Sequence, residues 1–196
     1  IRQLMLFSRK QPVQKLNLNL NTSIRDIMFL LERLLGEDIS VEFEQASSAC
    51  SVMADPGNID QIIMNLAVNA RDAMPDGGRF EISLRRIHFD QPPLDEPQMA
   101  AGDWVVIMAG DTGSGIPAEN LAKIFEPFYS TKPKGTGLGL AVSYAIIKNH
   151  QGDIHAFSRP GQGGCLVLEL PVLTTSAQPQ NRCGDNKNAQ DSRGTR

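Results

Sequence analysis

The chain has 196 residues, about the length of one domain, and 41% of them are hydrophobic, which is enough to bury a core. Its net charge of -3 provides no basic field that would draw nucleic acid or anionic lipid. Its longest apolar runs are far shorter than the roughly 20 residues of a membrane-spanning helix. No signal-peptide pattern opens the chain, so we expect a cytoplasmic segment without direct membrane contact.

The cysteines give no sign of a stapled or metal-bound fold. Cys50, Cys165 and Cys183 are widely spaced, and no two of them form a C-x-x-C pair. This spacing argues against a disulfide framework and against a zinc site, and it is compatible with a reducing compartment.

The first part of the chain predicts a helix end, a strand, a helix and a second strand. Residues 1–10 have apolar side chains at helical spacing and no preceding cap, which indicates the end of a helix that Pro12 stops. Residues 16–20 alternate between apolar and polar and predict a strand. The helix predicted over 23–35 begins at a capping cluster, Asn21, Thr22 and Ser23, and is ended by Gly36. Residues 39–43 alternate again and predict a strand.

The middle of the chain predicts a long helix followed by two strands. Pro56 stands at a tolerated first-turn position and begins a helix predicted over 56–74. Residues 79–88 predict a strand, and the polar, proline-rich residues 89–102 predict a loop. Residues 104–109 form an apolar run that predicts a strand leading directly into an aspartate.

The last part predicts one helix and two strands. Residues 117–134 are irregular or partly helical, residues 138–149 predict a helix, and residues 153–158 and 165–170 predict strands joined by a Pro-Gly turn. Residues 174–196 have almost no apolar content, and we expect a disordered tail or linker there. The elements together predict one α/β (α+β) two-layer sandwich, a mixed β-sheet with helices packed on one face.

Two asparagines lie beside the apolar stripe of the helix predicted over 56–74. At about 100° per residue, Asn65 and Asn69 share a face that borders this stripe. A neutral amide oxygen can complete a Mg²⁺ shell that nucleotide phosphates and water otherwise fill. Taken alone, the pair is more typical of a solvated helix face than of a metal site. The stripe comprises Ile59, Ile62, Ile63, Leu66, Ala70, Ala73 and Met74.

An aspartate followed by two glycines comes directly after an apolar strand. Gly113 and Gly115 allow positive φ and the close approach of a flat ring, and the Asp111 carboxylate can accept a hydrogen bond from an amine such as that of adenine. A capped turn explains the segment without any ligand. Asp-Thr-Gly-Ser is also the signature of aspartic proteases, but that chemistry needs a second such aspartate and a fold that is nearly all β. The chain has no second copy and has several predicted helices.

A glycine-rich stretch at 135–140 leads into the helix predicted over 138–149. Backbone N–H groups at a helix start bind anions. No Gly-Lys-[Ser/Thr] follows, and the spacing is not that of a dinucleotide fingerprint, so the stretch alone fits a plain turn equally well. Lys132 and Lys134 are placed to reach a terminal phosphate, or else they are solvated lysines of a mobile loop.

Four segments in order carry a specific family resemblance: NLAVNARDAMPDGG at 65–78, DTGSGIP at 111–117, FEPFYSTK at 125–132 and GTGLGL at 135–140. They resemble the asparagine box, first glycine box, phenylalanine box and second glycine box of bacterial sensor histidine kinases. These kinases belong to the GHKL ATPase superfamily. The resemblance covers about residues 1–172. The amino-acid sequence of the asparagine box is similar to that of the subgroup whose members often carry PAS and receiver domains.

This resemblance implies a Bergerat ATP-binding fold with ATP and Mg²⁺ as cofactors. Asn69 would bind the metal, and Asp111 would accept from the adenine amine. Residues 118–136 would form a mobile ATP lid that Phe125 and Phe128 seat. The implied cofactor-binding residues are Asn69, Asp72, Asp111, Gly113, Gly115, Ile116, Phe125, Thr131, Lys132, Gly135, Thr136, Gly137, Leu138, Gly139 and Leu140.

The implied reaction is transfer of the ATP γ-phosphate to histidine in two-component signal transduction or a phosphorelay, with Asn65 and Lys132 as catalytic residues. Asn65 stands where hydrolytic relatives such as gyrase and MutL carry a general-base glutamate, and an amide cannot take a proton from water. The implied partners are an upstream dimerisation and phosphoacceptor hairpin and a receiver domain of a response regulator. A homodimer is expected only in a longer kinase, and nucleic acid is not an expected partner.

The chain departs from the family pattern in two places. His88, His150 and His155 match no phosphoacceptor box, so we expect this segment to bind ATP without phosphorylating itself. Gly164 stands where a serine or threonine is common. The expected division is a hairpin end with linker over 1–12, the ATP-binding domain over 13–173, and the tail over 174–196.

Two alternatives remain at this stage. One is a degenerate ATP-binding module that signals by contact, against which the four intact boxes argue. The other is an anti-sigma-type serine kinase of the same superfamily, against which the hairpin-like residues 1–10 and Asn65 argue.

Overall fold

The computed structural model describes residues 14–92, 99–133 and 135–172. The predictions for 1–12, for 174–196, for Lys134 and for the centre of the 89–102 loop lie outside these residues. The elements are β1 (Leu16–Asn19), α2 (Leu20–Leu35), β2 (Ile39–Glu44), β3 (Ser51–Ala54), α3 (Pro56–Ala73), β4 (Gly78–Phe89), β5 (Gly102–Asp111), α4 (Ala118–Leu121), α5 (Gly139–Asn149), β6 (Asp153–Ser158) and β7 (Gly164–Pro171).

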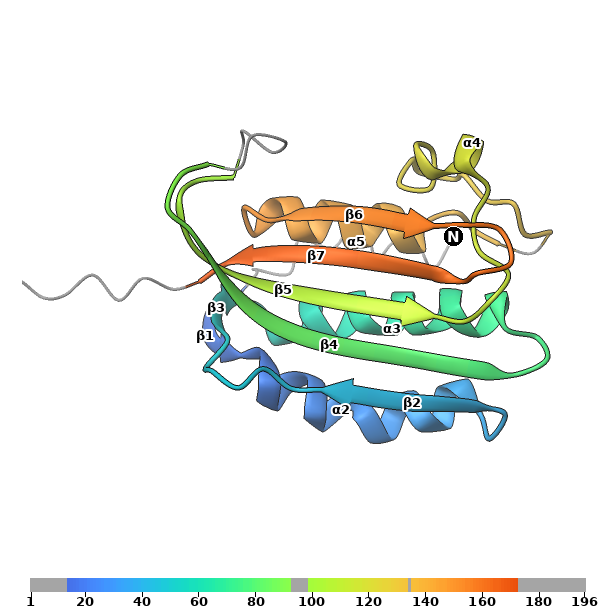
Figure 1. The fold of residues 1–196 in the computed structure, drawn as a ribbon, viewed down its shortest axis with the longest axis horizontal. Coiled ribbons are helices and arrows are strands. Elements are labelled where there is room, and N and C mark those ends of the chain that lie inside the picture. Colours follow the sequence, from blue (N-terminus) through green and yellow to red (C-terminus); the bar gives the residue numbers. More distant parts are fainter. Residues whose placement is uncertain (1–13, 93–98, 134, 173–196) are drawn as a thin grey trace, which may run out of the picture.

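A five-stranded mixed sheet with the order β2-β4-β5-β7-β6 forms one layer of the molecule. β2 runs parallel to β4, and the other neighbouring strands are antiparallel. Helices α2, α3 and α5 lie together on one face of this sheet (Figure 1). The predicted two-layer sandwich is therefore confirmed. A separate two-stranded sheet joins β1 to β3, and the sequence analysis missed β3 because Ser51–Ala54 (SVMA) does not alternate between polar and apolar residues.

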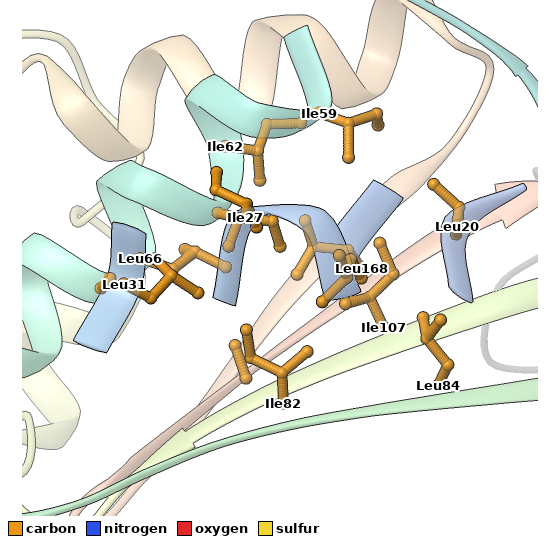
Figure 2. Close-up of a cluster of buried hydrophobic side chains, with 14 of the residues drawn as sticks. Leu20, Ile27, Leu31, Ile59, Ile62, Leu66, Ile82, Leu84, Ile107 and Leu168 are labelled. Carbon is orange, nitrogen blue, oxygen red and sulfur yellow. The ribbon is translucent and has the colours of Figure 1, made fainter. Parts of the chain in front are cut away.

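The core fills the space between the helices and the sheet (Figure 2). Burial of each such aliphatic side chain contributes roughly 1.5–3 kcal/mol. The labelled core residues come from α2, α3 and three central strands: Leu20, Ile27, Leu31, Ile59, Ile62, Leu66, Ile82, Leu84, Ile107 and Leu168.

Helix α3 lies between α2 and α5 and packs on the sheet as the apolar stripe predicted. All members of that stripe except Ala73 are buried, and Ala67 is buried with them. Asp55 caps the helix, because its side chain accepts a hydrogen bond from Asn58 N at 3.2 Å. The helix that presents the asparagine box is thus held by burial along its length and by a cap at its start.

Helix α2 begins earlier than predicted, at Leu20. Asn19 is the actual cap, and its side chain accepts from Asn21 N at 3.0 Å. Asn21, predicted as part of the capping cluster, bonds instead to the 46–48 segment, and its Oδ1 accepts from Ala46 N at 3.1 Å. The Asn21 side chain therefore bonds to a segment distant in sequence, and Asn19 caps the helix in its place.

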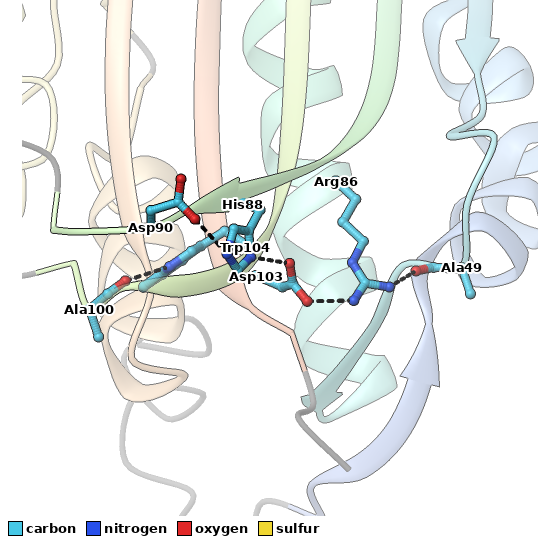
Figure 3. A network of polar contacts seen from close by, with 7 residues as sticks. All are labelled: Ala49, Arg86, His88, Asp90, Ala100, Asp103 and Trp104. Carbon is cyan, nitrogen blue, oxygen red and sulfur yellow. Dashed lines mark hydrogen bonds and ion pairs between the residues drawn. The ribbon is translucent and has the colours of Figure 1, made fainter. Parts of the chain in front are cut away.

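A polar network lies at the end of the sheet remote from Asp111 (Figure 3). Arg86 Nη2 donates to Asp103 Oδ2 at 2.6 Å, and His88 Nδ1 lies 2.7 Å from Asp103 Oδ1. The hydrogen bonds from Arg86 and then His88 hold the pKa of Asp103 below its usual value. His88 pairs with Asp103 and Phe80 with Asp111, so the network is roughly 27 Å from Asp111 at about 3.4 Å per residue.

Asp55 also joins three separate parts of the chain. Its Oδ2 accepts from Gln14 N at 3.0 Å, and its backbone N donates to Nε2 of the buried His150 at 3.4 Å. Lys15 Nζ donates to Asn149 O at 2.8 Å beside this junction. The start of α3, the end of α5 and the incoming chain are therefore linked at one aspartate. None of the described helices is long and apolar enough to cross a membrane.

We expect Asp55→Ala to lower the free energy of unfolding by about 1–2 kcal/mol, because it removes the helix cap and the acceptor for Gln14 N. Asp55→Ser keeps a capping oxygen and should lose less than half of that. Urea unfolding of both variants checks this, with the exposed Asp76→Ala as the control. Equal losses for alanine and serine would show that the cap is not the important contact.

Candidate nucleotide-binding site

The predicted site segments gather around the second half of α3. Asn65 and Asn69 are half-buried beside the apolar stripe, and Asp72 and Ala73 follow at the end of the helix. Asn65 contacts the second glycine box, Asp72 contacts the lid, and Ala73 contacts the first glycine box. One helix therefore brings together all four segments that the sequence analysis singled out.

Asn65 ties α3 to the start of α5. Its Nδ2 donates to Gly139 O at 3.0 Å and to Ser143 Oγ at 3.3 Å. Asn69, about one turn further along the helix, is also half-buried. The two amides thus lie on the side of α3 that faces the glycine-rich helix start.

Asp111 is the last residue of β5, and its carboxylate organises the turn that follows. Its Oδ1 accepts from Gly113 N at 2.9 Å, and Gly164 N donates to the same carboxylate. Ser114 N donates to Ala73 O at 3.0 Å, and a Cβ on Gly113 would lie only 2.6 Å from that oxygen. Only glycine permits this close approach of the turn to α3.

Gly115 and the β6–β7 turn form the other side of this segment. Gly115 has a φ of 72°, and a Cβ there would collide with Arg159 O. Ile116 N donates to Ser158 Oγ at 2.8 Å, and Ser158 Oγ donates to Gly163 O at 2.6 Å. Sequence reasoning missed Ser158, because a hydroxyl at a strand end gives no signal until its partners are known.

Burial raises the pKa of the Asp111 carboxyl above its usual value. Hydrogen bonds from Gly113 N and Gly164 N and the positive charge of Lys132 oppose this effect without cancelling it. A partly desolvated acceptor that is held by backbone donors is well suited to read a ligand amine.

An open cavity of about 450 Å³ lies beside this turn, between α4 and the β6–β7 hairpin. Its lining includes Leu121, Phe157, Ser158 and Gly164, but neither α3 nor Asp111. The cavity therefore borders the site from outside, and the contacts to α3 define the site better than the cavity does.

The predicted lid, residues 118–136, contacts α5 through one aromatic ring and has a hydrogen bond within itself. The Phe125 ring lies 5.7 Å from the Tyr144 ring of α5, and Tyr129 OH donates to Asn120 Oδ1 at 2.7 Å. Phe128 is 66% exposed and has a φ of 68°, which is unusual for a residue with a side chain. The Phe125 ring thus packs against α5, whereas the Phe128 side chain faces solvent, and the seating of a lid by these two residues stays a prediction.

The glycine loop is held against the lid by its backbone. Phe128 N donates to Gly137 O at 2.9 Å, and Gly137 has a φ of 66°. A Cβ on Gly137 would collide with the backbone of Phe128. Gly137 is therefore required both by its conformation and by the close contact, and it links the lid to the start of α5.

Lys132 pairs with a carboxylate of α3. Its Nζ lies 2.9 Å from Asp72 Oδ2, and Arg71 Nη2 lies 3.4 Å from Asp72 Oδ1. Partial burial alone would raise the pKa of Asp72, but the hydrogen bonds and charges of Lys132 and Arg71 together hold it below its usual value. The lysine predicted to reach a phosphate is thus engaged with an acidic group.

The other predicted residues line the same region with different exposure. Ile116, Leu138, Gly139 and Leu140 are half-buried, whereas Thr131, Gly135 and Thr136 are exposed. Thr136 Oγ1 accepts from Leu138 N at 3.4 Å and helps to shape the turn into α5.

The three histidines of the chain contact residues outside this region. His88 belongs to the network around Asp103. His150 is buried at the end of α5, with its Nδ1 at 2.8 Å from Ile146 O. His155 lies on β6 near Glu169, and their side chains are 3.8 Å apart.

Known proteins resemble this chain in sequence and in fold. The profile of the family described as "Histidine kinase-, DNA gyrase B-, and HSP90-like ATPase" matches residues 54–174. The sensor kinase CckA of Brucella abortus (strain 2308) is 44% identical over 176 residues, which cover 88% of this chain and 19% of that protein. The chain therefore spans about a fifth of the length of this curated relative.

Solved structures agree with this relationship. The catalytic domain of histidine kinase ThkA, in a nucleotide-free form, has a TM-score of 0.64 and 30% identity, and the match covers 80% of this chain and 95% of that one. Histidine kinase ThkA in complex with response regulator protein TrrA has a TM-score of 0.67 and 27% identity, and the match covers 88% of this chain and 46% of that one. The chain belongs to the histidine kinase-, DNA gyrase B- and HSP90-like ATPases, and it is homologous to the catalytic ATP-binding domain of sensor histidine kinases.

Proposed function

We propose that this chain binds ATP and Mg²⁺ at the second half of α3 and transfers the γ-phosphate to a histidine on a dimerisation hairpin. The observation that carries the proposal is that α3 contacts the lid and both glycine boxes through Asn65, Asp72 and Ala73. The family match supports the nucleotide. Phosphoryl transfer at such a site depends on positioning and on neutralisation of charge.

Asp111 is the proposed adenine-reading group. Its carboxylate lies at the end of β5, partly buried and held by Gly113 N and Gly164 N. A carboxylate accepts from the exocyclic amine of adenine and repels the carbonyl group that guanine has in that position. Gly113 and Gly115 would let the ring approach the backbone closely.

Asn69 is the proposed Mg²⁺ ligand, and the residues present fit this ion. The described residues contain no group of three or more His, Cys, Asp or Glu side chains that could hold a metal. Mg²⁺ keeps several waters and binds substrate phosphates, so the protein needs to supply only one or two oxygen ligands. Asn69 would supply one directly, and Asn65 would hold a water of the metal shell. The bound ion would neutralise charge on the transferring phosphoryl group.

The glycine loop and Lys132 are proposed to hold the phosphates. Residues 135–140 lead into α5, an 11-residue helix whose first N–H groups point at the loop. Thr131, Gly135, Thr136, Leu138 and Leu140 would line this part of the site. Lys132 would leave its ion pair with Asp72 and bind a phosphate. Asp72 would then affect nucleotide binding only by competing for Lys132.

The absence of a carboxylate at position 65 supports transfer over hydrolysis. An amide orients a water molecule but does not take its proton, so hydrolysis would be slow. The acceptor would be a histidine on an upstream hairpin. ThkA has been solved with a response regulator. By analogy, a receiver domain would then take the phosphate, in a cytoplasmic kinase that dimerises through the hairpin and belongs to the PAS or hybrid subgroup.

We expect ATP and ADP to bind at least about tenfold more tightly than GTP, because a hydrogen bond to a carboxylate is lost and a repulsion is added with guanine. Calorimetry with each nucleotide checks this. Asp111→Asn should remove most of the ATP affinity, and the remote, exposed Asp90→Asn should not change it. Equal affinity for ATP and GTP would refute the role of Asp111.

We expect Asp72→Asn to increase ATP affinity by up to about fivefold, because the exposed ion pair with Lys132 is worth at most about 1 kcal/mol. The gain should disappear in a Lys132→Met background, where no lysine remains to be released. Titrations with all four proteins measure this coupling. If Asp72 bound the nucleotide directly, Asp72→Asn would weaken binding instead.

We expect the 196-residue chain to bind ATP without acquiring phosphohistidine, because transfer needs a nitrogen held in line with the γ-phosphate. His150 is buried, and at about 1.5 Å per residue it lies roughly 15 Å from the start of α5. Incubation with γ-labelled ATP should leave the chain unlabelled. Adding the hairpin should give an acid-labile, base-stable phosphate on the hairpin. Stoichiometric label on the chain itself would contradict the proposed acceptor.

A further inference from the structure

A buried hydroxyl group contacts the side chain of Asn65. Ser143, in the second turn of α5, is 0% exposed, and its Oγ donates to Gly139 O at 3.1 Å. The same Oγ accepts from Asn65 Nδ2 at 3.3 Å, and Nδ2 also donates to Gly139 O at 3.0 Å. Asn65, Gly139 and Ser143 therefore form a closed triangle of hydrogen bonds between α3 and α5.

The triangle decides which way the Asn65 amide points. Gly139 O can only accept, so the atom 3.0 Å from it must be the NH₂ group, since the flipped amide would place two oxygens together. Ser143 uses its one proton on Gly139 O and accepts from Asn65, so the NH₂ group donates to both oxygens of the triangle. Among the described residues, none donates a hydrogen bond to Asn65 Oδ1. This oxygen is consequently the part of the side chain left for a ligand.

Packing alone does not call for a serine at this position. The other buried side chains of α5 are Ala141, Ile146 and Ile147, all apolar. A buried hydroxyl is costly unless it is hydrogen-bonded, and an alanine would fill nearly the same volume without that requirement. The hydroxyl is therefore best explained by its hydrogen bond to the Asn65 side chain.

We propose that Ser143 is a positioning residue, which acts through Asn65 by fixing its Oδ1 toward the Mg²⁺ and phosphate side of the site. The inference rests on the proposed function, in which Asn65 holds a water of the metal shell. It also explains why an amide stands at position 65, since a carboxylate would have no hydrogen to offer to Gly139 O, which can only accept. The triangle thus connects the choice of residue at 65 to the choice at 143.

A double-mutant cycle on the 196-residue chain tests the inference. Affinity for ATP is measured by calorimetry with and without Mg²⁺ for the wild type, Ser143→Ala, Asn65→Ala and the double variant. Ser143→Ala should lower the affinity in the presence of Mg²⁺ by about two- to tenfold, the range for one hydrogen bond, and should hardly change it without Mg²⁺. In the Asn65→Ala background, Ser143→Ala should have no further effect. Ser83→Ala removes another buried serine, on β4, and serves as the matched control.

Two outcomes of the cycle would overturn the inference and separate it from the proposed function. If Asn65→Ala weakens Mg²⁺-dependent binding but Ser143→Ala does not, the positioning role is wrong and the role of Asn65 stands. The positioning role is also wrong if Ser143→Ala has the same effect in both backgrounds. If Asn65→Ala leaves Mg²⁺ dependence unchanged, the proposed role of Asn65 fails, and the inference fails with it.

A second measurement needs no nucleotide. Asn65→Asp should be less stable to urea than Asn65→Ala at pH 7, because its carboxylate lies against the carbonyl oxygen Gly139 O, which can only accept, and has no proton to donate to it. The difference should shrink on acidification, since protonation restores one donor. Equal stability of the two variants at pH 7 would show that the triangle does not require a donor at position 65, and would reject the inference.

Discussion

The burial of α3 is the constraint on which the rest of the structure depends. This helix lies between α2 and α5 with its apolar stripe on the sheet, and its orientation is therefore set by the core. Everything that makes the site is attached to its remaining faces: Asn65 to α5, Asp72 to the lid and Ala73 to the turn after β5. A close-packed core transmits displacements. Any shift of α3 would consequently move all three attachments together.

Backbone contacts, more than side chains, shape the region around α3. Gly113 approaches Ala73, Gly115 approaches Arg159, and Gly137 approaches Phe128, each too closely for a Cβ. These contacts place backbone N–H groups and a partly buried carboxylate at one end of the sheet. The glycines therefore have a role that goes beyond flexibility, because they let separate segments of the chain lie in contact around the site.

Charge in the region is paired. Lys132 and Arg71 both pair with the Asp72 carboxylate at the end of α3, while Asp111 accepts from backbone donors, and the charge of Lys132 affects its pKa less than these hydrogen bonds do. The exposed pair contributes little to stability, because solvent screens it. The phosphate-binding role proposed for Lys132 requires that the lysine can leave Asp72, and a weak, exposed contact would release it at low cost. A buried pair would hold its lysine too firmly for such an exchange.

Sequence alone determined the elements with a strong local signal and the identity of the site segments. The periodicity of α3 and the alternation of β2 predicted those elements closely, and the four boxes predicted which segments would meet. Tertiary structure decided what depends on partners distant in sequence. The Asn21 side chain bonds to the 46–48 segment and does not cap α2. The strand β3 pairs with β1, and the Phe128 side chain faces solvent. Lys132 met Asp72, and the Ser143 hydroxyl met Asn65, at separations of 60 and 78 residues. The physical reason is that a hydrogen bond or ion pair depends on distance and direction, which chain folding sets and no local pattern encodes.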